Sequence, residues 1–111
     1  MALGYLGDSG GDTWNGYLTV ITDAFSPMPL MTTVQVNAWG DPLDTTADCG
    51  FNRCGGFGDF NDVIIDQHGR AWFGLAHNVG GEIGIFGTMA IGPTLRDMPL
   101  ATLPIGGPST L

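Results

Sequence analysis

The sequence contains no lysine, and its three arginines face ten aspartates and one glutamate, which gives a net charge of −8. A phosphate backbone attracts basic surfaces, so this balance argues against nucleic-acid binding. No apolar run approaches the roughly 20 residues of a membrane-spanning helix. The first residues, MALGYLG, also lack the basic and apolar regions of a targeting segment. We therefore expect neither a nucleic-acid partner nor a membrane span.

Charged residues make up only 13% of the chain and apolar residues 43%, while 19 glycines and 7 prolines indicate many turns. This composition is typical of a buried β structure and not of a disordered chain. A length of 111 residues is enough for one domain with a modest core.

Two groups of three strands are predicted from apolar or alternating segments separated by turn signals. The second group comprises residues 61–65, 70–77 and 82–91, and its middle strand has apolar or small residues on both faces, as expected of a strand between layers. The first group comprises residues 2–6, 16–22 and 31–37. Its last strand alternates with period two and is expected to be half-exposed and outermost. Its first strand begins without a preceding turn, as though an inner neighbour were missing.

The segment YLGDSGGDTWNGYLTVITDAF and the later segment DPLDTTADCGFNRCGGFGDFNDVIIDQHGRAWFGLAHN resemble the C-terminal part of sialidase-like (BNR repeat) β-propellers. The shared features are a strand ending in LG, a polar loop, a W-x-x-Y strand, a long cysteine-containing loop and D-F-x-D-x-x-x-D-x-x-G-R. The resemblance implies an all-β, antiparallel fragment of about one and a half to two four-stranded blades. Residues 1–37 and 61–92 would supply the blade strands, residues 38–60 a long loop, and residues 93–111 a Pro/Gly-rich surface tail.

In such propellers the ligand face is built by loops at one end of the strands. The loops 7–15, 38–60 and 78–81 would share that face here, with the turn 66–69 on the opposite face. They would gather the following side chains: Asp8, Asp12, Asp41, Asp44, Asp48, Arg53, Asp59, Asp62, His77 and Glu82.

Sialidase-type catalysis, which the resemblance brings into consideration, needs an arginine cluster, an acid and a tyrosine activated by a glutamate. This chain offers Arg53 for a substrate carboxylate and Glu82 as its single glutamate. Asp59 and Asp62 could act as an acid and its modulator or bind calcium, but they could equally cap the start of a strand. We expect no glycosidase turnover from the chain alone.

Three further residue groups are candidates for binding. Asp41, Asp44 and Asp48 form an oxygen-rich segment that could hold calcium, although it lacks the EF-hand spacing, and no other cofactor is indicated. Arg53, Trp39 and His77 are the candidate ligand-binding residues. Trp39 begins the long loop and could stack on a sugar ring.

Cys49 and Cys54 are the only two cysteines, and both lie in a glycine-rich loop. We expect a local disulfide, which would stabilise the loop by about 2 kcal/mol on the chain-entropy model. A disulfide implies an oxidising, extracellular or cell-surface location. The alternative is a pair of free thiols in a cytosolic protein.

Three functions follow as hypotheses. The chain could be a non-catalytic part of a sialidase-like propeller, completed by other chains or by copies of itself and binding carbohydrate at the loop face. It could instead be a glycosidase whose site is completed by partner subunits, or a self-assembling structural β protein. Unpaired strand edges recruit further strands, so an isolated monomer is not expected.

Overall fold

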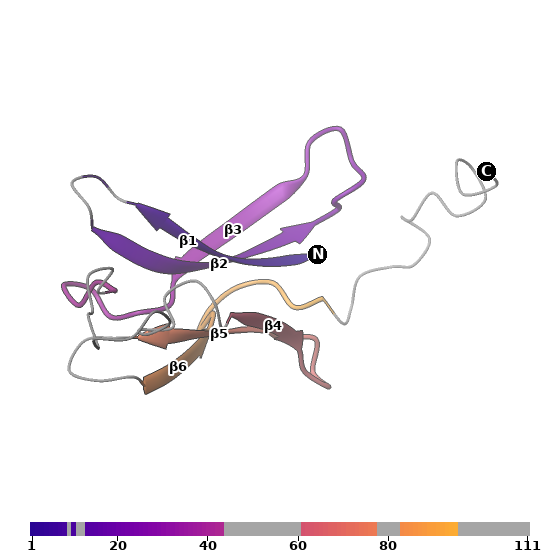
Figure 1. Cartoon of the computed structure of the whole chain (residues 1–111). Helices are drawn as coiled ribbons and strands as arrows, with labels where there is room; N and C mark the ends of the chain where they lie inside the picture. The colour runs from indigo at the N-terminus through magenta and orange to yellow at the C-terminus, as the bar shows by residue number, and fades with distance from the viewer. Residues whose placement is uncertain (9, 11–12, 44–60, 78–82, 96–111) are drawn as a thin grey trace, which may run out of the picture.

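The computed structural model describes residues 1–8, 10, 13–43, 61–77 and 83–95. These residues form two antiparallel three-stranded sheets, which Figure 1 shows as stacked layers. Sheet A has the order β1 (Ala2–Asp8), β2 (Trp14–Thr22), β3 (Leu30–Gln35). Sheet B has the order β4 (Asp62–Ile65), β5 (Ala71–His77), β6 (Ile83–Thr88). The described residues contain no α-helix, so the predicted all-β class is confirmed. Within these ranges there is accordingly no helix that is long and apolar enough to span a membrane.

The predicted strands are all present, but two of them end earlier than expected. β3 ends at Gln35 and not at residue 37, because the side chain of Asn37 replaces a backbone partner: its Oδ1 accepts a hydrogen bond of 2.8 Å from the Gly16 N–H. β6 ends at Thr88 and not at residue 91, and the following Met89 is buried in the core. β3 lies at the edge of sheet A, as predicted, with Met31 63% exposed.

One face of each sheet packs against the other sheet to form the core. β1 contacts β4 and β2 contacts β5. Leu18 and Val20 of β2 and Phe73 and Leu75 of β5 are buried there. Burying side chains of this size stabilises the fold by roughly 1.5–3 kcal/mol each. Gly16 permits the close approach of the sheets, because a Cβ atom on it would lie 3.0 Å from Leu75 Cδ1.

The outer face of β5 differs from the prediction of a strand buried on both sides. Ala71, Phe73, Leu75 and His77 alternate as the buried face, whereas the other face is only half-buried. Trp72 lies on this second face, with its ring centroid 6.1 Å from that of Phe86. The difference arises because sheet A covers only one face of sheet B.

The turn between β4 and β5 is organised by Asp66. Its Oδ1 accepts hydrogen bonds from the backbone N–H groups of His68 (2.8 Å) and Arg70 (3.0 Å), and its Oδ2 accepts one from Trp72 Nε1 (2.9 Å). The indole donor of Trp72, followed by the Arg70 N–H, lowers the pKa of Asp66 below its ordinary value. Gly69 adopts a φ of 78°, which an L-residue disfavours, and its N–H bonds the Asp66 carbonyl at 2.9 Å.

After β6 the described chain returns to this turn. The Leu95 N–H donates a 2.7 Å hydrogen bond to the Gly69 carbonyl, and the Leu95 side chain packs partly against the core. The described residues after β6 therefore contact the rest of the fold at least as far as Leu95.

Candidate functional site at the loop end of the sheets

The candidate site lies at the end of the domain where β2 begins and β5 ends; we call this the loop end. Here the chain leaves the sheet ladder after Val36, whose N–H bonds the Gly16 carbonyl at 2.8 Å. It rejoins the same strand at Leu43, whose N–H bonds the Trp14 carbonyl at 2.8 Å. Leu43 is 4% exposed and belongs to the core. Residues 37–42 thus form a short loop that is fixed at both of its ends, and we call it the platform loop.

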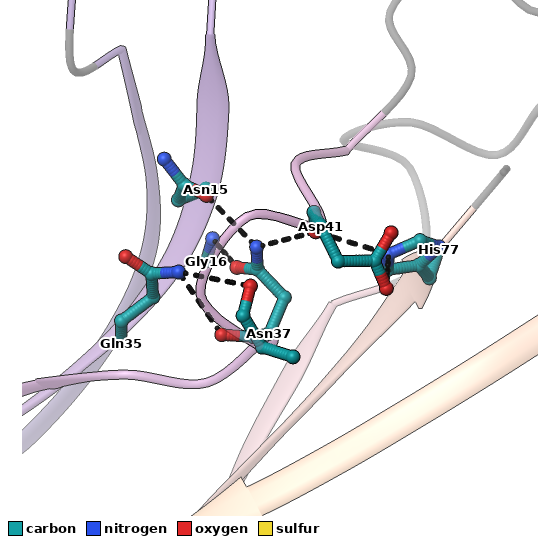
Figure 2. Close-up of polar contacts among 7 residues, drawn as sticks. Asn15, Gly16, Gln35, Asn37, Asp41 and His77 are labelled. Atoms are coloured by element: carbon teal, nitrogen blue, oxygen red, sulfur yellow. Dashed lines mark hydrogen bonds and ion pairs between the residues drawn. The ribbon is translucent and has the colours of Figure 1, made fainter.

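Asn37 fills the interior of the platform loop, as Figure 2 shows. Its side chain is 3% exposed and forms three hydrogen bonds. Oδ1 accepts from the Gly16 N–H at 2.8 Å, while Nδ2 donates to Asn15 Oδ1 at 2.8 Å and to the Asp41 carbonyl at 2.9 Å. A buried amide whose donors and acceptor are all engaged specifies one loop conformation, because each lost partner would leave a desolvated polar group.

The loop is also tied to sheet B through Asp41 and His77. His77 Nε2 lies 3.3 Å from Asp41 Oδ2 and 3.3 Å from the Asp41 carbonyl oxygen (Figure 2). The His77 side chain is 5% exposed, whereas the Asp41 side chain is 53% exposed. His77, predicted as a ligand-binding residue, therefore directs its Nε2 at the platform loop and orients Asp41.

Trp39 lies at the tip of the platform loop and is 90% exposed. Gly40, with a φ of 81°, and a 3.1 Å hydrogen bond from the Asp41 N–H to the Ala38 carbonyl close the turn that carries it. Gln35 Nε2 donates to the carbonyls of Asn37 at 3.0 Å and of Ala38 at 3.4 Å. The indole is thus exposed to solvent on a backbone that is held from several directions.

A groove of about 450 Å³ lies beside Trp39 on the outer face of sheet A. Its lining includes Asn15, Tyr17, Thr33, Gln35, Trp39 and Pro42. Tyr17 continues the aromatic surface toward β1, because its ring stacks on that of Tyr5 with centroids 5.5 Å apart. Small-molecule sites have volumes of this order and combine apolar walls with a few polar groups.

Asp8, a further residue predicted for the loop face, ends β1 opposite Trp14 and therefore also lies at the loop end. Asp62 begins β4, where its exposed Oδ1 accepts a 2.9 Å hydrogen bond from the Val63 N–H. This contact is the one expected if Asp62 caps the start of the strand. The following predicted residues lie outside the described ranges: Asp44, Asp48, Cys49, Arg53, Cys54, Asp59 and Glu82. The calcium site and the disulfide therefore stay predictions, and within the described ranges no three carboxylate, histidine or cysteine side chains cluster as metal ligands.

Sequence reasoning missed Asn15, Gln35 and Asn37, which build the platform loop. Their hydrogen bonds join residues up to 22 positions apart, so no local pattern reveals them. The only signal in the sequence is Asn37, which ends the period-two segment 31–37. At such a position an asparagine side chain can form a hydrogen bond with a backbone group in place of the next strand–strand hydrogen bond.

Comparisons with protein-family models, with curated proteins and with solved structures found no match to this chain.

Proposed function

We propose that this chain is a non-catalytic part of an extracellular, sialidase-like β-propeller, that further sheets cover its two outer faces, and that its loop end binds carbohydrate. The observation that carries the proposal is the apolar character of both outer faces of the two-sheet stack. A blade inside a propeller has the same surroundings, because a neighbouring sheet packs on each of its faces.

The outer face of sheet B carries large apolar side chains on a flat surface. Ile64 is 57% exposed and Phe86 is 74% exposed, with Trp72 between β4 and β6. Gly74 and Gly84 lie on the same face, and a Cβ atom on Gly84 would have no atom within 4 Å. A contiguous apolar surface of this kind is a common feature of protein–protein interfaces.

The outer face of sheet A is apolar at the end away from the groove. Met31 is 63% exposed and lies opposite the buried Ile21 of β2, and Leu3, which is 44% exposed, lies opposite Thr19, one position nearer the groove on the same face. A sheet packed on this half would leave the loop end, with Trp39, open. The two outer faces point in opposite directions, so each could receive a different neighbouring sheet. In a solution of the purified chain alone, these neighbours would be further copies of the same chain.

The carbohydrate part of the proposal rests on the exposed Trp39 beside its groove. The non-catalytic part is supported by two of the described candidate carboxylates, since Asp62 accepts a hydrogen bond from the next N–H of its own strand and Asp41 contacts His77. We therefore expect no hydrolysis of sialic-acid substrates by the chain alone.

The native mass of the purified chain tests the assembly. We expect a closed oligomer, for example three copies completing a six-bladed ring, because a ring leaves no outer face uncovered. Ile64→Asp and Phe86→Asp should lower the mass, since each places a charge on the outer face of sheet B. Met28→Asp is the matched control, because Met28 is 85% exposed in the turn before β3 and outside both faces.

A stable monomer at micromolar concentration would contradict the proposed assembly. A mass that grows without limit as the concentration rises would favour an open, self-assembling structural protein over a closed propeller.

A further inference from the structure

The groove beside Trp39 has a chemical character that narrows the class of its ligand. Its walls are the indole of Trp39, the phenol ring of Tyr17 and the ring of Pro42. Its polar groups are the amides of Asn15 and Gln35 and the hydroxyl groups of Thr13 and Thr33. None of the lining residues that the structure describes has an ionised side chain, so these residues offer a charged ligand no counter-charge to compensate its loss of water.

Hydrogen bonds fix the backbone that carries Trp39 in the free protein. Asn37 fixes the platform loop from within and Gln35 binds two of its carbonyls from the sheet. An aromatic side chain on a fixed backbone loses little conformational entropy on binding, which is the property of interface anchors. A 90% exposed indole is otherwise a cost to the free protein, because its apolar surface remains in water.

Charge excludes one class of sugar. The chain carries a net charge of −8. Asp41 lies in the sequence between Gly40 and Pro42, which both line the groove. Acidic saccharides would be repelled by this field and would find no arginine or lysine in the described part of the lining. Uncharged saccharides present an apolar C–H face for an aromatic ring and hydroxyl groups for amides and threonines.

We propose that the groove formed by Trp39, Tyr17, Gln35 and Thr33 binds an uncharged saccharide, with the sugar face against Trp39 and its hydroxyl groups donating to Gln35 Oε1 and Thr33 Oγ1. Acceptor oxygens are the contacts to expect, because Gln35 Nε2 already donates to two carbonyls and Thr33 Oγ1 already shares a 2.7 Å hydrogen bond with Thr19 Oγ1. This inference rests on the carbohydrate part of the proposed function and makes it specific, because it excludes sialic acid as the sugar in this groove.

The test is a binding measurement with the intact chain on an array of neutral oligosaccharides of hexoses, pentoses and N-acetylhexosamines, together with lactose and sialyllactose as a matched pair. We expect at least one neutral oligosaccharide to bind and sialyllactose to bind no better than lactose. Trp39→Ala should weaken the binding by about tenfold or more, the loss typical of an aromatic anchor. Phe25→Ala, which removes an exposed aromatic ring from the turn between β2 and β3, should leave the affinity unchanged.

The possible failures separate the two proposals. Tighter binding of sialyllactose than of lactose, lost in Trp39→Ala, would overturn the inference and leave the carbohydrate proposal in place. Absence of binding to every saccharide on the array would overturn both. Sugar binding that survives in Trp39→Ala would place the site elsewhere and overturn the inference alone. Trp39→Ala removes an exposed side chain, so its thermal unfolding should match that of the parent chain and verify that the variant is folded.

Discussion

Gly4 of β1 lies directly against the ring of Phe73 of β5, with no room for a side chain between them. A Cβ atom on Gly4 would overlap the Phe73 ring and would lie 2.6 Å from Val63 Cγ2. The two sheets therefore approach each other closely where a glycine of one faces an aromatic ring of the other. In a core packed this tightly, even a single added methyl group displaces the neighbouring side chains.

Gly4→Ala should destabilise the fold, because the added methyl group must displace Phe73 or separate the sheets. We expect the free energy of unfolding to fall by about 1–3 kcal/mol, the usual cost of overpacking. Denaturant unfolding at one fixed protein concentration measures it, since association would otherwise change the apparent stability. Gly84→Ala is the control: nothing lies within 4 Å of its Cβ position, and its stability should be unchanged or slightly higher. Equal stability of Gly4→Ala and the parent chain would mean that the sheets are less closely packed.

Asn37→Asp tests the polar network under Trp39. The substitution keeps the acceptor for the Gly16 N–H but replaces the donor to Asn15 and Asp41 by a second carboxylate oxygen. We expect the free energy of unfolding to fall by about 3 kcal/mol, because a buried charge then faces two acceptors. Asn61→Asp makes the same chemical change at an exposed residue and should alter stability by less than about 0.5 kcal/mol. Similar losses for the two variants would refute the role assigned to Asn37.

Stability in acid should report on Asp66. Its pKa is lowered in the folded protein, first by the Trp72 indole and then by the Arg70 N–H, so the folded state binds this proton less readily than the unfolded state. The resulting stabilisation is present above the ordinary pKa of about 4 and is lost as the pH falls through the lower, folded pKa. Trp72→Phe removes the largest of these causes and should raise the folded pKa of Asp66 toward its ordinary value. Melting temperatures between pH 2 and 6, a range of about 2 units on either side of that pKa, should then show the variant losing less stability than the parent chain on acidification. Parallel curves would contradict this.

The sequence predicts that Cys49 and Cys54 are bonded to each other. Thiol labelling of the unfolded, unreduced protein should modify neither cysteine, and labelling after reduction should modify both. Two modified cysteines without reduction would contradict the disulfide and remove the support for an extracellular location.

The strands could be predicted because the alternation of side chains along them is local. The segment 31–37 shows period-two alternation, whereas the segment around Phe73 has apolar or small residues on both faces, which identifies a strand but not the face that is buried. Trp39 is exposed at the start of the long loop, as its proposed role requires. The end of β3 could not be predicted, because the backbone donor that the Asn37 side chain satisfies belongs to β2. The contact of Asp41 with His77 joins residues 36 positions apart and depends on the packing of the two sheets. No local pattern contains that information.

The return of the chain to β2 at Leu43 separates the six residues of the platform loop from whatever follows them. Because Leu43 is anchored in the core and bonded to Trp14, changes in the chain after this residue do not pull on the turn that carries Trp39. Because the platform loop is fixed at both ends, the residues at its tip could be substituted independently of the longer connection that leads to β4. A library of substitutions at residues 38–40 could therefore alter ligand preference while the fold and the downstream connection stay constant.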